Sequence, residues 1–181
     1  GDVYKRQDLI DVLNSFLFTM CYARRLRLIS GEGIIIKGLP LKFKIVPIRE
    51  IPTEQLVAFF AHQPEEAFEF FKPHGFDGKA IREVVKNKSF LTFVVLKDDV
   101  TVGYFFLRCF VNGKCFRGKI VHKDWQGRGI AKLMGMAMTK VSQHLDLCMF
   151  GSISPENYAS MASAKASNDI KVHKILENGY Y

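Results

Sequence analysis

The chain has 181 residues, of which 48% are hydrophobic, and a formal net charge of +8, which is enough apolar material for one folded domain with a sizeable core. No apolar run reaches the roughly 18 residues that a membrane span requires, and the apolar stretch 16–23 does not end in a small-residue cleavage pattern, so we expect neither a membrane segment nor a signal peptide. The basic residues are spread along the chain rather than clustered, which argues against a nucleic-acid surface.

The N-terminal part of the chain predicts one amphipathic helix. Residues 2–7, Asp-Val-Tyr-Lys-Arg-Gln, match the translation of a common sequencing adaptor, so we expect residues 1–7 to be a non-native segment. Residues 8–30 predict an N-terminal helix with an apolar stripe that reaches Ala23. The stripe either packs on the domain or belongs to a lost upstream segment. Residues 31–181 predict a single domain, whose last strand we expect to be incomplete because the chain stops directly after a turn.

The first half of that domain predicts two short strands and then three helical segments: strands at 34–36 and 41–46, and helices at 54–62, 64–71 and 79–86. Thr53 is expected to cap the first of these helices, and Asp77 precedes the third. In the third helix, Ile81, Val84 and Val85 are expected to face inward. The aromatic residues around Phe60 and Phe71 favour core packing. Alternatively, they line a cleft with Lys72 and His74 at its edge.

Three β-prone runs follow, at 89–96, 100–111 and 114–121. Residues 97–99 predict the first turn, and Asn112-Gly113 predicts a two-residue hairpin. With that hairpin, Phe110 would face Cys115.

Cys109 and Cys115 would then be out of register across the hairpin, so no disulfide is expected. The four cysteines include no C-x-x-C pair, which fits free thiols in a reducing cytoplasm.

The most informative stretch is residues 121–131, where a strand ending at Val121 enters a glycine turn and then a helix. Backbone N–H groups at such a junction face outward, and the helix dipole adds positive charge, which suits a pyrophosphate. Beyond this helix we expect a strand at 145–154, a helix at 155–166 and a strand at 170–176. The apolar face of the first helix comprises Ile130, Leu133, Met134, Ala137, Met138 and Val141.

This stretch resembles the cofactor signature of the GNAT superfamily of N-acetyltransferases, which is Gln or Arg, two residues, Gly, one residue, then Gly or Ala. It stands here as Gln126-Gly127-Arg128-Gly129-Ile130-Ala131. Val102-Gly103-Tyr104 resembles the start of the third strand in that family. Residues 154–157 resemble the junction between the family's fifth strand and the helix that follows it. The resemblance covers roughly residues 42–181. It implies an α/β fold, a mixed and mostly antiparallel twisted sheet flanked by helices, with the N-terminal helix as an addition.

The resemblance also implies how acetyl-coenzyme A would bind. The amides of Arg128, Gly129, Ile130 and Ala131 would hold the pyrophosphate, and Gln126 and Gly127 belong to the same loop. The pantetheine arm would lie along Ile120 and Val121 like an added strand, which requires the next strand to splay away. Asn157 would bond the pantetheine amides, although capping a helix explains it equally well. A neutral amine would then attack the acyl carbon directly, without a covalent enzyme intermediate.

The catalytic residues depart from the family pattern. Two alignments place Ala164 or Ile175 where relatives keep a tyrosine as general acid, and 114–121 contains no acidic residue that could act as a base. The remaining candidates are His122, Tyr158 and Ser160, each of which also has an ordinary structural explanation.

The implied activity is acyl transfer, most simply of acetyl, to a primary amine whose identity the sequence does not choose. The alternative is a regulatory module that binds acyl-coenzyme A without turnover. We expect no nucleic-acid partner, no membrane association and a cytoplasmic location. We also expect no metal site, since the five histidines lack ligand spacing. The oligomeric state stays open, with a homodimer among the arrangements allowed.

Overall fold

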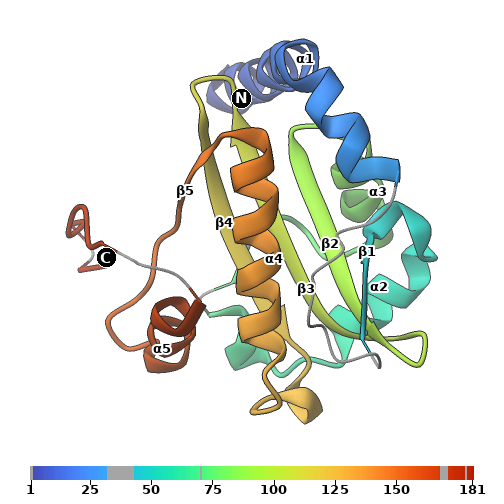
Figure 1. Ribbon diagram of the computed structural model, residues 1–181, viewed down its shortest axis with the longest axis vertical. Helices are drawn as coiled ribbons and strands as arrows, with labels where there is room; N and C mark the ends of the chain where they lie inside the picture. The colour runs from blue at the N-terminus through green and yellow to red at the C-terminus, as the bar shows by residue number, and fades with distance from the viewer. Residues whose placement is uncertain (1, 32–42, 70, 168–170, 178) are drawn as a thin grey trace.

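The computed structural model describes residues 2–31, 43–69, 71–167, 171–177 and 179–181. In these residues a five-stranded sheet lies between layers of helices, and its strands follow one another in chain order (Figure 1). Neighbouring strands are antiparallel except for the last pair, which is parallel. The strands are β1 (Lys44–Pro47), β2 (Phe90–Lys97), β3 (Val100–Phe110), β4 (Lys114–Val121) and β5 (Cys148–Phe150). This confirms the expected α/β class with a mixed, mostly antiparallel sheet.

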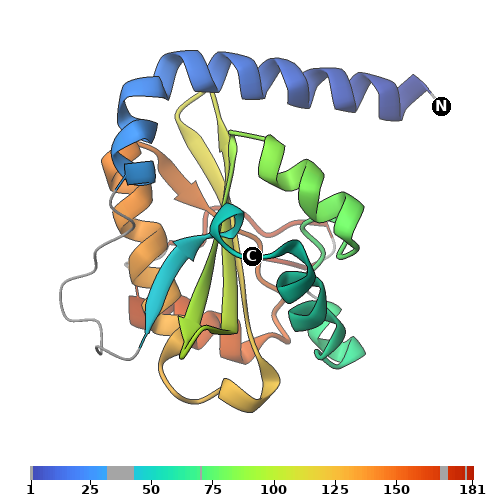
Figure 2. The ribbon, with the colours of Figure 1, turned by 90° about the vertical axis from the view of Figure 1, so that its right-hand side faces the viewer.

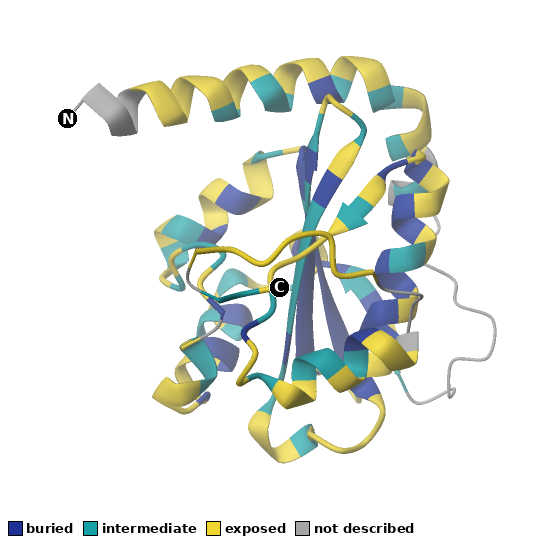
Figure 3. Ribbon diagram, turned by 90° about the vertical axis from the view of Figure 1, so that its left-hand side faces the viewer, coloured by how far each residue is buried: buried dark blue, intermediate teal, exposed yellow. Residues whose placement is uncertain are grey.

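Helices cover both faces of the sheet, as Figure 2 shows from the side. The α-helices are α1 (Asp2–Gly31), α2 (Thr53–Ala61), α3 (Gly78–Lys86), α4 (Ile130–Leu145) and α5 (Tyr158–Ser167). Because side chains alternate along a strand, β3 supplies two separate cores. Phe105 and Leu107 pack with α4 and with Phe18 of α1, whereas Tyr104 and Phe106 pack with α2 and α3. The sheet is accordingly the buried centre of the fold (Figure 3).

Helix α4 has the amphipathic pattern that the sequence predicts. Its six predicted apolar positions are all buried, and Leu145 extends the same face. The helix begins after Gly129, whose φ of 80° is left-handed, and ends at Asp146, whose φ is 58°. The Asp146 N–H donates to the carbonyls of Gln143 and Ser142, which satisfies helix-end acceptors. The sequence thus places the start of this helix correctly, whereas its end lies at Leu145, where the sequence predicts the start of the next strand.

The β3–β4 hairpin corrects a predicted register. Phe110 pairs with Lys114, so the turn has three residues and Val111 belongs to it rather than to the strand. Within this turn only Gly113, with φ of 77°, is left-handed, whereas a two-residue type I′ turn needs two such residues. Cys109 therefore lies directly opposite Cys115, and the predicted offset is wrong. Both thiols are nevertheless free and buried, as expected of core cysteines.

Two further details differ from expectation, and a third agrees with it. Thr53 is the first residue of α2 rather than its cap, and Pro52 at the cap position offers no side-chain acceptor. Val85 is 41% exposed because α3 turns only Ile81 and Val84 inward. Asp77 does cap α3, since its carboxylate accepts from the backbone N–H groups of Lys79 and Ala80.

Near the C-terminus, the strand predicted at 145–154 is reduced to β5, because the chain turns away from β4 after Phe150. No strand forms in the described residues 171–177. Instead, Tyr181 and Ile153 exchange two backbone hydrogen bonds. The predicted strand 34–36 lies outside the described residues, as does the beginning of the one predicted at 41–46.

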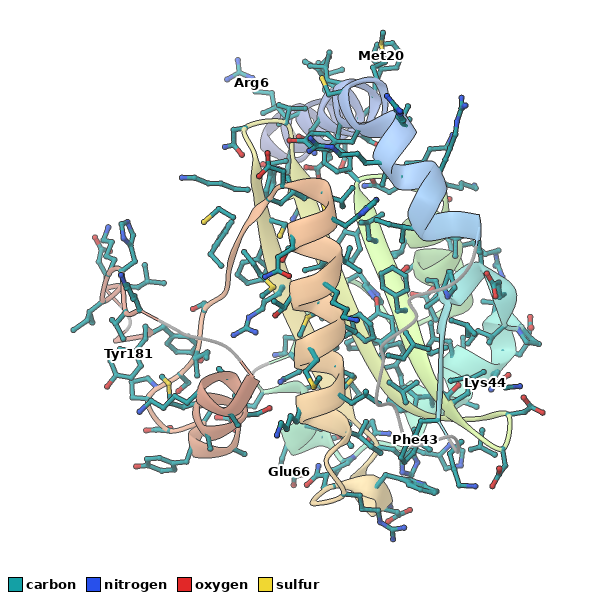
Figure 4. The ribbon with its side chains drawn as sticks, in the orientation of Figure 1. Arg6, Met20, Phe43, Lys44, Glu66 and Tyr181 are labelled. Carbon is teal, nitrogen blue, oxygen red and sulfur yellow. The ribbon has the colours of Figure 1, made fainter. Side chains whose placement is uncertain are left out.

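The first part of helix α1 crosses one end of the sheet and extends past α3, and its last part bends to run down beside the sheet (Figure 2). Phe18 is fully buried, while Met20 is 65% exposed and points away from the domain (Figure 4). Asn14 bonds the Cys109 carbonyl and the Val111 N–H, and Asp11 pairs with Arg108. None of the described helices is both long and apolar enough to cross a membrane.

Candidate functional site

The candidate site begins where β4 and β5 part. Their pairing comprises three residue pairs, of which the last is Phe116 with Phe150. β4 continues to Val121, so residues 117–121 have no strand partner on that side within the described chain. The β5 end of the chain swings away toward α5 (Figure 1). The splayed strands that the sequence analysis requires are therefore present.

The backbone of β4 presents unpaired groups to this opening. The His122 N–H donates to the Val102 carbonyl at 2.9 Å, and Ile120 lies opposite Tyr104. In an antiparallel pair, alternate residues direct both backbone groups to the same neighbour. Ile120 therefore faces β3, whereas Val121 and Lys119 direct their N–H and C=O groups into the opening. An extended ligand can pair with such an edge.

The glycine turn follows directly. Gly127 and Gly129 have φ of 72° and 80°, and a Cβ built on either would meet no atom within 4 Å among those described. Open space therefore lies in front of the turn. At the start of α4, the Leu133 N–H donates to the Gly129 carbonyl. The backbone N–H groups that precede Leu133 have no acceptor within the helix, as in the first turn of any α-helix. The backbone amides and positive helix end suit an anion.

The side chains of the turn add positive charge and rigidity. Arg128 lies over the ring of Trp125, with its guanidinium carbon 4.7 Å from the centroid. Trp125 in turn meets the edge of Phe43. A short 3-10 helix, Lys123–Trp125, connects the strand to the glycines. The Lys123 N–H donates to Gln63 Oε1, which ties this connection to the end of α2.

A cavity of about 280 Å³ extends the opening along β4. It is bounded by β4, by the chain after β5, by α5 and by the 71–73 segment. The side chains that matter for its chemistry are Lys72, Arg117, Lys119, Asn157, Ser160 and Tyr180. None of the described residues that line it is Asp or Glu, so the cavity is cationic with neutral polar groups.

Lys119 ties together the elements around the opening. Its ammonium donates to the Ala131 carbonyl at 2.8 Å and to the Ser163 hydroxyl at 2.6 Å. Burial, and secondarily the charge of Arg117, lowers the pKa of Lys119 to about 8. Burial also lowers the pKa of Arg117, whose Nη1 is enclosed without a hydrogen-bond partner among the described residues.

The predicted catalytic candidates are not gathered in one place. Ser160 lines the cavity. Tyr158 is 80% exposed at the start of α5. The His122 ring accepts from the Asp124 N–H and lies 5.9 Å from the Phe59 ring, outside the described cavity lining. Asn157 does line the cavity, and its Oδ1 accepts from the Ser160 N–H. Asn157 therefore lines the cavity and also caps the start of α5.

His74 belongs to the aromatic core rather than to the cavity lining. Its Nε2 lies 2.7 Å from the Tyr104 hydroxyl and its Nδ1 lies 2.6 Å from the Gly75 carbonyl. Burial lowers the pKa of His74, so the neutral ring accepts from the tyrosine and donates to the carbonyl. Phe60 and Phe71 are buried in this core, which confirms the core-packing interpretation, but Phe71 and Lys72 also line the cavity, as the alternative interpretation expected.

Sequence reasoning did not nominate Arg117, Lys119 or Tyr180. Strand alternation alone places Arg117 and Lys119 on one face of β4. The resemblance requires a parted strand next to β4, but it does not indicate that the parting begins after Phe116 and leaves these two side chains beside the opening. The position of Tyr180 depends on the pairing of the chain end with Ile153, which no local pattern predicts.

The sequence matches no protein-family model and no curated protein. The fold does resemble solved structures. The GNAT domain of the S. lividans protein PAT matches with a TM-score of 0.63 at 12% identity, over 76% of this chain and 86% of that one. RimL, a ribosomal alpha-N-protein acetyltransferase in complex with coenzyme A, matches with a TM-score of 0.63 at 13% identity, over 81% and 93%.

A third match is the spermidine N-acetyltransferase from Vibrio cholerae in complex with coenzyme A and spermine, with a TM-score of 0.60 at 12% identity over 76% of this chain and 86% of that one. At these identities the similarity concerns the fold. The parted strands, the glycine turn and these structural matches agree, and the chain has the fold of the GNAT acetyltransferases.

Proposed function

We propose that this chain is an N-acetyltransferase of the GNAT superfamily that transfers an acetyl group from acetyl-coenzyme A to a primary amine. One observation carries the proposal: β4 loses its parallel partner after Phe116 and then leads into a turn of exposed amides at the start of α4. An ordinary strand-to-helix connection needs no parted strand. The coenzyme A complexes among the structural matches support the same interpretation.

The residues present fit coenzyme A. The amides of residues 128–131 hold the pyrophosphate, with Gln126 and Gly127 completing the loop. The arm lies along the β4 edge, where Val121 and Lys119 offer backbone groups and Ile120 anchors the strand to β3. Asn157 borders the same space. When bound, acetyl-coenzyme A supplies an acyl group activated as a thioester.

The reaction is direct transfer. The amine nitrogen forms a bond to the acyl carbon, the C–S bond breaks, and coenzyme A leaves as a thiol after the nitrogen gives up one proton. A β4 amide that faces the opening stabilises charge on the acyl oxygen. Lys119, Ser160 and Tyr180 border the cavity, and they are the groups that we propose for proton transfer in place of the missing tyrosine.

A second function, acyl-coenzyme A binding without turnover, is favoured by one observation. Ala164 occupies one of the two positions aligned with the family's usual tyrosine, and it is 2% exposed on α5. The two functions differ in a single readout, because both predict binding but only the enzyme releases free thiol when amines are added.

The test compares two glycines. Gly129→Leu places a side chain in the open space before the amides, whereas Gly113→Leu alters a glycine of similar φ in the distant hairpin turn. Acetyl-coenzyme A should raise the melting temperature of the unmodified chain and of the Gly113 variant but not of the Gly129 variant. A shift that survives in the Gly129 variant would remove the proposed binding site.

A further inference from the structure

The Arg117 guanidinium lines the cavity and has no ion-pair partner in the part of the chain that the structure describes. Its Nη1 is enclosed without a hydrogen-bond partner among the described residues, and its stem packs beside Gly151 in the segment after β5. An enclosed cationic N–H without an acceptor is unfavourable, because it has lost its contact with water and gained no partner in exchange. Arg117 is therefore arranged for an anion that the chain itself does not provide.

The surroundings strengthen that conclusion. Lys119 and Lys72 also line the cavity, and no carboxylate is found among its described lining residues. After burial, the charge of Arg117 is the second cause that lowers the pKa of Lys119, because two like charges on one face of a strand disfavour each other. A ligand anion near both cations would reduce this repulsion and would accept a hydrogen bond from Nη1 of the guanidinium.

Coenzyme A does not supply this anion. Strand residues rise about 3.3 Å each, so Arg117 lies roughly 13 Å along β4 from Val121. The glycine turn, where the pyrophosphate binds, lies farther on, beyond His122. The pantetheine arm that spans the distance is neutral. The negative group opposite Arg117 must therefore belong to the other substrate.

We propose that the acceptor is a small primary amine that also carries an anionic group, a carboxylate or a phosphate, and that Arg117 binds this group. The inference rests on the proposed acetyltransferase function and names its substrate class. The cavity volume of about 280 Å³ suits a small molecule. Spermine, present in the Vibrio cholerae structure, carries only positive charge, and a cavity lined by three cations would repel it.

The experiment uses matched amines with the full chain and acetyl-coenzyme A. β-Alanine is compared with β-alaninamide, and phosphoethanolamine with ethanolamine, so the two arms distinguish carboxylate from phosphate. Spermidine is the cationic comparison. The rate at which free thiol is released gives kcat/KM for each amine. The shift in melting temperature, measured with coenzyme A present, reports binding of the amine without turnover. At least one anionic amine should exceed its neutral partner about tenfold in kcat/KM, and spermidine should be inactive.

Arg117→Met should lose this preference while keeping the shift caused by acetyl-coenzyme A alone. Arg82→Met, which removes the same charge from the exposed face of α3, should keep both. Equal responses to all amines, a preference for spermidine, or a preference that survives in Arg117→Met would each overturn the inference. The absence of any shift with acetyl-coenzyme A in the unmodified chain would instead overturn the proposed function.

Discussion

Lys119 Nζ on β4 lies 2.6 Å from Ser163 Oγ on α5, and this hydrogen bond spans the side of the opening where β5 is absent. The same ammonium donates to the Ala131 carbonyl in the first turn of α4. One side chain therefore connects the strand edge, the helix that follows the glycine turn and the helix that bounds the cavity. Its ionisation links the geometry of the site to pH.

The pH dependence of stability should report this buried lysine. Its folded pKa of about 8 is below the usual value of 10.5, so between these two pH values the unfolded chain binds more protons. Stability contributed at this position is therefore lowest below pH 8 and rises as pH increases toward 10.5. Partial solvent exposure reduces the effect, which we expect to be about 1–2 kcal/mol.

Urea unfolding of the unmodified chain and of Lys119→Met at pH 7, 8, 9 and 10 measures this effect. The free energy of unfolding of the unmodified chain should rise relative to that of the variant across this series. Lys132→Met, on the exposed side of α4, is the control for lost charge. A difference between Lys119→Met and the unmodified chain that stays constant with pH would contradict the expected coupling.

Position 118 requires a glycine, because the ring of Phe106 occupies the space that any side chain there would need. A Cβ built at this position would lie 2.4 Å from Cε1 of Phe106, which is 3% exposed. Gly118→Ala should therefore destabilise the fold by about 1–3 kcal/mol through overpacking. Phe106→Leu shortens the obstructing side chain, so the double variant should be less destabilised than the sum of the two single variants. Additive free energies of unfolding would show that the ring is not the cause.

Asn14 anchors the long N-terminal helix. Its side chain accepts from the Val111 N–H and donates to the Cys109 carbonyl. Asn14→Ala leaves both backbone groups without that partner, and we expect a loss of about 1–2 kcal/mol in unfolding free energy. Gln7→Ala removes an exposed contact with Asp11 within the helix and should change stability by less than about 0.5 kcal/mol. Equal losses in the two variants would argue against this anchoring role.

The four cysteines should divide into two classes. Cys21 and Cys148 are exposed, whereas Cys109 and Cys115 are buried. Burial raises the pKa of Cys115 to about 12 and raises that of Cys109 further, so neither forms the reactive thiolate at neutral pH. A thiol reagent at pH 8 should modify two cysteines quickly and the others only with denaturant. Rapid reaction of all four in the native protein would contradict the observed burial.

The sequence predicts the parts of the site that depend on local pattern. The apolar spacing of α4 and the glycines before it define a strand, a turn and a helix, and those three elements occur in the structure. The Asp77 cap was predictable for the same reason, because its acceptors are two and three residues away. The β3–β4 register was not, since one extra turn residue brings Cys109 opposite Cys115.

The sequence by itself determined the amphipathic helix and the glycine turn, because each depends on residues that are close together in the chain. The tertiary structure decided which faces meet. It placed Arg117 and Lys119 beside the gap left by β5, joined Lys119 to Ser163, and brought Tyr180 to the same cavity. The physical reason is that burial and charge pairing arise from segments distant in sequence, whose approach depends on how the sheet and helices pack.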